Sequence, residues 1–202
     1  MSQLSKEIKT IAVQLFKDLG FKKKHVFFFK DRTCDVSDSI FLTTAKYGPN
    51  YPLRISLTVG MQYIPFEEYK ATLSEYSLAI ARRSRTIGTN IGYANPELGS
   101  WFVWEVRDTD DIPIVMNHIK NAYYEIAIPF YENHSTKETI LAEIGRWGGY
   151  SRWVDLPIAE LLLGNIGRAE SLFNEFKQEG KYVLANEITF AKNFEKELLS
   201  NC

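Results

Sequence analysis

The chain has 202 residues, of which 45% are hydrophobic and 24% are charged, and its net charge is −1. These values are ordinary for a globular protein and exclude a disordered or fibrous chain. The 24 basic and 25 acidic residues nearly balance, so any binding to nucleic acid must come from a local patch. Two cysteines are too few for a disulfide framework or a structural zinc site.

The first ten residues, MSQLSKEIKT, carry charge where a signal peptide needs an apolar core. No apolar run approaches the length of a membrane span. We therefore expect a cytoplasmic protein that does not contact a membrane.

The first part of the chain predicts one helix followed by three strands. Apolar residues recur at helical spacing from residue 3, and Gly20 is the expected stop of that helix. Residues 25–31, 36–47 and 53–63 favour β-branched and aromatic side chains and are separated by turn signals. Because the turns between these strands are short, the sheet is expected to be antiparallel.

The middle of the chain predicts two more helices and a further strand. A helix is expected after Pro65, then a loop or bulged hairpin at 88–99 and a strand at 101–107. Acidic residues at 108–111 suit the first turn of the next helix. Its core face is expected to include Ile114, Met116, Ile119, Tyr123 and Ile126.

The last third begins with a glycine-rich joint, GRWGGYSRW, and three helices are expected at 156–163, 166–176 and 182–199. We therefore predict an α+β fold, in which helices cover an antiparallel sheet of about five strands. The predicted domains are an α+β domain at 1–147 and a three-helix subdomain at 148–202 packed on it.

Several segments in a fixed order also resemble a known family. LGFKKK, an aromatic strand, LRISLTVGMQY, an Arg-containing stretch, SWFVWEV and a helix ending in AIPFYEN are similar to the bacterial family catalogued as domain of unknown function 4304. The resemblance covers about residues 5–135 and implies a small α+β fold and a bacterial origin. It implies no activity. The chain departs from the pattern at FLTTAKY, where a glutamine is expected near the end of the second strand.

No catalytic, metal or cofactor site is predicted. His25, His118 and His134 are dispersed, and Cys34 lies among charged turn residues without the surroundings that activate a nucleophile. No GxSxG elbow, dinucleotide fingerprint or phosphate loop is present. The glutamates of the helix after Pro65, including Glu67, are interpreted as ordinary helix surface.

Basic residues beside aromatic residues give the candidate binding site. Lysines 22–24 are interpreted as a solvated turn. An arginine cluster and the tryptophan-containing joint are the types of residue that bind a protein hot spot or single-stranded nucleic acid. The alternative for the joint is that its tryptophans attach the helical tail to the sheet domain. The candidate binding residues are Arg82, Arg83, Arg85, Trp147, Tyr150, Arg152 and Trp153.

The preferred hypothesis is a non-catalytic, cytoplasmic protein-binding module whose partner is another protein, such as an immunity or defence-associated protein. One alternative is a single-stranded nucleic-acid binder that uses the same arginines and aromatic residues. The other is an enzyme with an unfamiliar site around the 88–99 loop. No cofactor is expected in any of these hypotheses.

Overall fold

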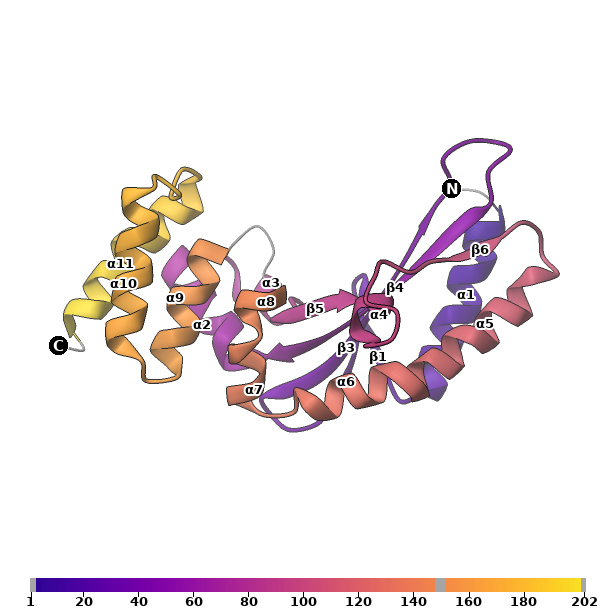
Figure 1. Ribbon diagram of the computed structural model, residues 1–202, viewed down its shortest axis with the longest axis horizontal. Coiled ribbons are helices and arrows are strands. Elements are labelled where there is room, and N and C mark those ends of the chain that lie inside the picture. Colours follow the sequence, from indigo (N-terminus) through magenta and orange to yellow (C-terminus); the bar gives the residue numbers. More distant parts are fainter. Residues whose placement is uncertain (1–2, 148–151, 201–202) are drawn as a thin grey trace. The chain divides into compact units, whose positions relative to one another are not determined.

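The computed structural model describes residues 3–147 and 152–200 and confirms the predicted α+β class. The sheet has six strands in the order β1-β2-β3-β4-β5, and β6 also pairs with β4 (Figure 1). Adjacent strands with a described register are antiparallel. The strands are β1 Lys22–Lys24, β2 Phe27–Asp31, β3 Val36–Ala45, β4 Leu53–Tyr63, β5 Ile87–Asn90 and β6 Trp104–Val106.

The chain forms two compact units whose bounds differ from the predicted domains 1–147 and 148–202. Unit 1 comprises Met1–Met61 and Gly88–His134, and unit 2 comprises Gln62–Ile87 and Ser135–Cys202. Residues 62–87 therefore group with the C-terminal helices, although they lie between strands of the sheet in sequence.

In unit 1, helix α1 (Gln3–Asp18) ends where the sequence predicts. Gly20 has φ +88°, and the N–H of Phe21 donates to the Phe16 carbonyl at 2.9 Å. This left-handed residue with its 6→1 bond is a Schellman cap. The Phe16 ring then packs against Phe28 of β2 with centroids 4.9 Å apart, which fixes α1 on one face of the sheet.

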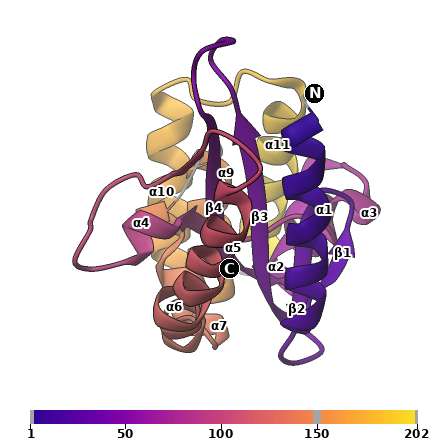
Figure 2. The ribbon, with the colours of Figure 1, turned by 90° about the vertical axis from the view of Figure 1, so that its right-hand side faces the viewer.

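A long helical segment covers the same face beside α1 (Figure 2). It consists of α5 (Asp111–Ala122), a π-helical turn at Tyr123–Ala127 and α6 (Ile128–Asn133). Pro129 lacks the N–H that an α-helix needs and its ring collides with the carbonyl four residues earlier, which accounts for the wider turn.

The predicted core face of this segment is partly wrong. Met116, Ile119 and Tyr123 are buried, whereas Ile114 is 57% exposed. The exposed residue follows Pro113 in the first turn, where the buried stripe is carried by Ile112 and Val115. The buried face of the first helical turn therefore differs from the predicted one, and the prediction holds only farther along the helix.

The predicted loop at 88–99 contains strand β5 and a short helix, α4 (Ile91–Ala94). Asn90 organises this corner: its Oδ1 accepts from the N–H groups of Gly92 and Phe102, and its Nδ2 donates to Ser56 Oγ and the Phe102 carbonyl. A Cβ atom at Gly92 would lie 2.2 Å from the Ser100 carbonyl oxygen, so the backbone approaches closely here. The hydrogen bonds of the buried Asn90 side chain therefore use both its amide group and its carbonyl oxygen fully.

Unit 2 is helical. The helix expected after Pro65 is divided at Glu75, which has φ +54°. The three predicted C-terminal helices are confirmed, with an aromatic cluster of Phe173, Phe190 and Phe194 among their buried side chains. The helices are α2 Ile64–Ser74, α3 Leu78–Ala81, α7 Lys137–Ala142, α8 Ile144–Trp147, α9 Arg152–Leu162, α10 Ile166–Gln178 and α11 Ala185–Ser200.

No helix in the described part of the chain has the length and apolar character needed to cross a membrane.

Candidate functional site

The candidate site is a groove in unit 1 between helix α1 and the outer half of strand β3, named here the α1–β3 groove. One part has a volume of about 340 Å³ and an apolar floor that includes Ala12, Phe28 and Leu42. A second hollow of about 550 Å³ adjoins it and shares Lys9 and Thr44. Both volumes lie in the range of ligand-binding clefts.

The end of the groove is formed by the turn between β1 and β2. Lys24 pairs with Phe27, so the loop between these strands has two residues, His25 and Val26. His25 has φ +59°, a conformation that glycine normally supplies in such turns. Because of this tight turn, β2 begins only at Phe27, and His25 and Val26 lie in the wall of the groove.

The rim of the α1–β3 groove is cationic. Lys9 of α1, Lys23 of β1, His25 of the turn and Lys46 after β3 line its two parts. No Asp or Glu is among the described residues that line either part. A floor of apolar side chains below ammonium groups suits a ligand that combines negative charge with apolar groups.

The lysines interpreted as a solvated turn form strand β1 at the edge of the sheet. Lys22 lies 3.8 Å from Asp31, and Lys24 lies over the Phe29 ring. Lysines on an edge strand oppose uncontrolled pairing with other strands. Lys23, which lies between them, lines the groove.

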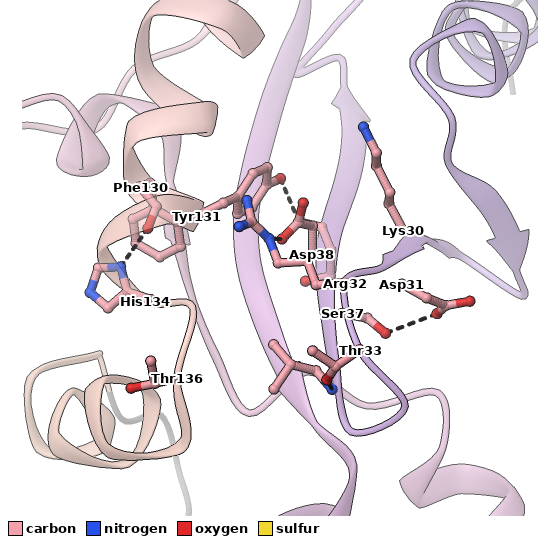
Figure 3. A network of polar contacts seen from close by, with 12 residues as sticks. Lys30, Asp31, Arg32, Thr33, Ser37, Asp38, Phe130, Tyr131, His134 and Thr136 are labelled. Atoms are coloured by element: carbon pink, nitrogen blue, oxygen red, sulfur yellow. Dashed lines mark hydrogen bonds and ion pairs between the residues drawn. The ribbon is translucent and has the colours of Figure 1, made fainter.

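A second polar cluster of unit 1 lies at the β2–β3 turn (Figure 3). Arg32 donates through Nε to the buried carboxylate of Asp38, and its guanidinium lies over the Tyr131 ring. Tyr131 in turn donates its hydroxyl to the Ser39 carbonyl at 3.0 Å. Burial raises the pKa of Asp38, and the Arg32 guanidinium opposes that shift. These contacts attach α6 to the sheet, which is a structural role.

The isolated candidates for chemistry in unit 1 have ordinary surroundings. Nδ1 of His134 lies 2.7 Å from the Phe130 carbonyl, at the end of α6. Cys34 is an exposed free thiol in the β2–β3 turn. Among the described residues, no cluster of three or more His, Cys, Asp or Glu side chains is placed to hold a metal ion.

The predicted arginine cluster lies in unit 2 at the end of α3. Arg82 and Arg83 are exposed, and Arg82 donates to Glu68 Oε1 at 2.6 Å. Arg85 is half-buried, and burial lowers the pKa of its guanidinium. The three side chains therefore differ in environment, and Arg82 is already held by a carboxylate.

The predicted joint is partly described. Trp147 ends α8, Arg152 is exposed at the start of α9, and Tyr150 lies outside the described residues. The Trp153 indole donates to Glu187 Oε1 at 2.9 Å, and the Trp153 carbonyl accepts from the Tyr182 hydroxyl. Trp153 therefore joins α9 to the start of α11 within unit 2. The predicted alternative, in which the tryptophans attach the helical tail to the sheet domain, stays a prediction.

Glu67, interpreted from the sequence as helix surface, is completely buried, and this interpretation is wrong. The Lys70 ammonium lies 3.5 Å from Glu67 Oε2 and 3.1 Å from Asp155 Oδ1 of α9. Burial raises the pKa of Glu67 to about 7, against the attraction of Lys70. Burial opposes the charge of Lys70, but the carboxylates of Glu67 and Asp155 leave its pKa raised overall.

This Glu67–Lys70–Asp155 cluster joins α2 to α9. Neither oxygen of Glu67 receives a hydrogen bond of normal geometry from the described residues. Because two carboxylates share the single ammonium group of Lys70, a proton on Glu67 relieves an excess of negative charge. Because its three side chains connect two helices, we assign the cluster a role in stability.

The sequence pattern alone did not identify the α1–β3 groove, because its residues come from four separate segments. One signal was available in the sequence: the LGFKKKH segment is followed directly by the aromatic strand, so the hairpin turn is tight and β2 is shorter than β3.

No protein-family model, curated protein or solved structure matches this chain. The resemblance to the family of domain of unknown function 4304 stays a prediction.

Proposed function

We propose that this protein is a non-catalytic binding protein whose partner is another protein, and that the partner binds in the α1–β3 groove. The predicted protein-binding function is kept, but its surface moves from the arginine and tryptophan residues of unit 2 to unit 1. The cytoplasmic location and the immunity or defence role stay part of the proposal, and the identity of the partner will decide them.

The observation that carries the proposal is the one-sided charge of the groove. Some exposed cations outside the groove lie beside carboxylates: Arg54 lies 3.1 Å from Glu105, and Lys177 lies 2.8 Å from Glu195. The groove gathers three lysines, Lys9, Lys23 and Lys46, around apolar groups, and no carboxylate is among its described lining residues. Charge of one sign around a cleft attracts a partner of the opposite sign and steers its association.

The test is affinity capture from a lysate of the native host, carried out with and without nuclease. The bait is the tagged full chain, its groove variant Lys9→Glu, Lys23→Glu and Lys46→Glu, or a control variant with Lys6, Lys17 and Lys120 changed to Glu. The control lysines are exposed residues of unit 1 outside the groove. Circular dichroism and thermal unfolding confirm that both variants fold.

We expect a stoichiometric protein on the wild-type and control baits, and a loss of at least tenfold on the groove variant. Equal capture by all three baits would refute the groove as the binding surface. Capture that disappears when nuclease is added would favour the nucleic-acid alternative.

A further inference from the structure

Strand β3 is longer than its neighbour β2, and this difference leaves part of β3 without a strand partner. The register of β2 with β3 runs from the Asp31–Ser37 pair to the Phe28–Ile40 pair. β3 continues to Ala45, as Figure 2 shows for the part that extends toward the β3–β4 loop. Among the described residues, no strand pairs with the outer half of β3 on the β2 side.

The hydrogen bonds at the other end of this hairpin identify which backbone groups face that open side. The Val36 carbonyl accepts from the Arg32 N–H at 2.9 Å, so the backbone groups of Val36 point toward β2. In an antiparallel strand the direction alternates with each residue. Leu42 and Thr44 therefore present their N–H and carbonyl groups to the open side, whereas Thr43 presents its groups to β4.

This open edge lies inside the α1–β3 groove, since Leu42 and Thr44 are among its lining residues. The side chains of even-numbered β3 residues are on the α1 face, as the 2.8 Å hydrogen bond between the Thr44 and Ser5 hydroxyls shows. Lys23 is on that face as well, because it pairs with Phe28, whose ring contacts α1. Lys9 belongs to α1 itself.

Lys9 and Lys23 thus lie on one face of the strand position that β2 leaves vacant. The opposite face carries half-buried aromatic residues, Phe27 and Phe41, with ring centroids 4.9 Å apart. A strand added at this position would direct alternate side chains to these two faces. One face favours acidic residues and the other favours apolar residues.

Building on the proposed function, we infer that the partner contributes an extended segment with acidic residues at alternate positions, which adds as a strand to the outer half of β3. Peptide backbone supplies both donors and acceptors, and Leu42 and Thr44 need both. A nucleic-acid backbone offers phosphate acceptors to the lysines but no matching N–H donors for the carbonyls. The edge therefore favours a peptide over an oligonucleotide, although both are anionic.

The experiment uses the full chain and a synthetic probe, the hexapeptide DVEVDV with blocked ends. Backbone amide hydrogen exchange is measured by NMR with and without millimolar peptide. We expect exchange at Leu42 and Thr44 to slow at least tenfold, with a smaller change at Thr43. The basic hexapeptide KVKVKV is the control and is expected to leave exchange unchanged.

N-methylation of the probe separates strand addition from charge attraction. Methylating one alternate set of peptide amides should weaken binding at least tenfold, while methylating the other set should have little effect, because only one set faces β3. Equal effects of the two sets, or no slowing at Leu42 and Thr44, would overturn the inference. Slowed exchange with an oligothymidylate of equal charge in place of DVEVDV would also overturn it.

The experiments distinguish a failure of strand addition from a failure of the proposed function. If the captured partner needs the groove lysines but neither DVEVDV nor the partner slows exchange at Leu42 and Thr44, strand addition is wrong and the proposed function stands. If capture does not depend on the groove lysines, the proposed function itself is wrong.

Discussion

The two units differ in where most of their charged groups lie. In unit 2, Lys70 is enclosed with two carboxylates, and Arg82 and Lys177 are each held by a glutamate. In unit 1, the buried polar group at the β5–α4 corner is the neutral amide of Asn90, and cations collect along an open groove. Unit 1 also has a buried ion pair, Arg32–Asp38, but in addition it collects lysines along an open groove.

The comparison shows that the structural surroundings of a basic residue, and not its neighbours in the sequence, indicate whether it is a candidate for binding a partner. Buried ion pairs are costly to break because the remaining charge loses its partner. Exposed lysines along a groove contribute little to stability. Mutations in the two regions should therefore change different properties.

The largest expected effect is that of Lys70→Met. The ammonium is the cation that lies against both Glu67 and Asp155, so its removal leaves two buried carboxylates facing each other. We expect a loss of about 3–5 kcal/mol in unfolding free energy, measured by urea denaturation at pH 7. Lys6→Met, at an exposed position of α1, should change it by less than about 0.5 kcal/mol. Similar values for the two variants would contradict the role of the cluster.

The next effect is that of Asn90→Ala in unit 1. The change removes four hydrogen bonds and leaves the Ser56 hydroxyl and the Phe102 backbone groups without the amide. We expect a loss of about 3 kcal/mol by urea denaturation, since each buried group left unpaired is costly. Asn95→Ala, at a half-exposed residue of the same loop, is the control. A loss below about 1 kcal/mol for Asn90→Ala would show that water replaces the amide.

A smaller effect appears in the pH dependence of stability. Burial raises the pKa of Glu67 from 4.5 to about 7, so the folded state binds this proton more tightly than the unfolded state. The unfolding free energy therefore falls as pH rises between these values, by about 2 kcal/mol from pH 5 to pH 7. Glu67→Gln should remove this part of the slope, whereas Glu68→Gln, on the helix exterior, should retain it. Identical slopes for wild type and Glu67→Gln would exclude the raised pKa.

The smallest stability effect is expected for Trp153→Phe. The smaller phenyl ring keeps part of the apolar contact, but the bond from the indole to Glu187 is lost. Glu187 also accepts from the N–H groups of Val183 and Leu184 at the start of α11, so it keeps two of its partners. We expect a loss of about 1 kcal/mol by thermal or urea unfolding. No loss would mean that the indole bond is not formed in solution.

The sequence predicted the fold better than the site. Strand 53–63 and the Gly20 stop were predicted correctly because alternation and glycine chemistry are local signals. The break in the helix at Glu75 was not predicted, because a glutamate with a left-handed backbone leaves no pattern in the sequence. Glu67 appeared to be surface because a charged residue on a helix normally is, and its burial depends on α9, far along the chain.

The candidate site depended even more on tertiary structure. Arginine and tryptophan clusters are visible in the sequence, but Glu68 of the preceding helix holds Arg82, and Glu187 of α11 holds Trp153. The α1–β3 groove combines Lys9, Lys23 and Lys46, which are separated by other elements and have no common motif. Its recognition required the sheet register.

The most direct test of the account compares the two candidate surfaces in one binding assay. Affinity for the captured partner is measured by isothermal titration calorimetry for the groove variant Lys9→Glu, Lys23→Glu and Lys46→Glu and for a unit 2 variant with Arg82, Arg83 and Arg152 changed to Glu. We predict a loss of at least tenfold for the groove variant and less than twofold for the unit 2 variant. The reverse order would place the binding surface where the sequence alone had put it and would contradict the account.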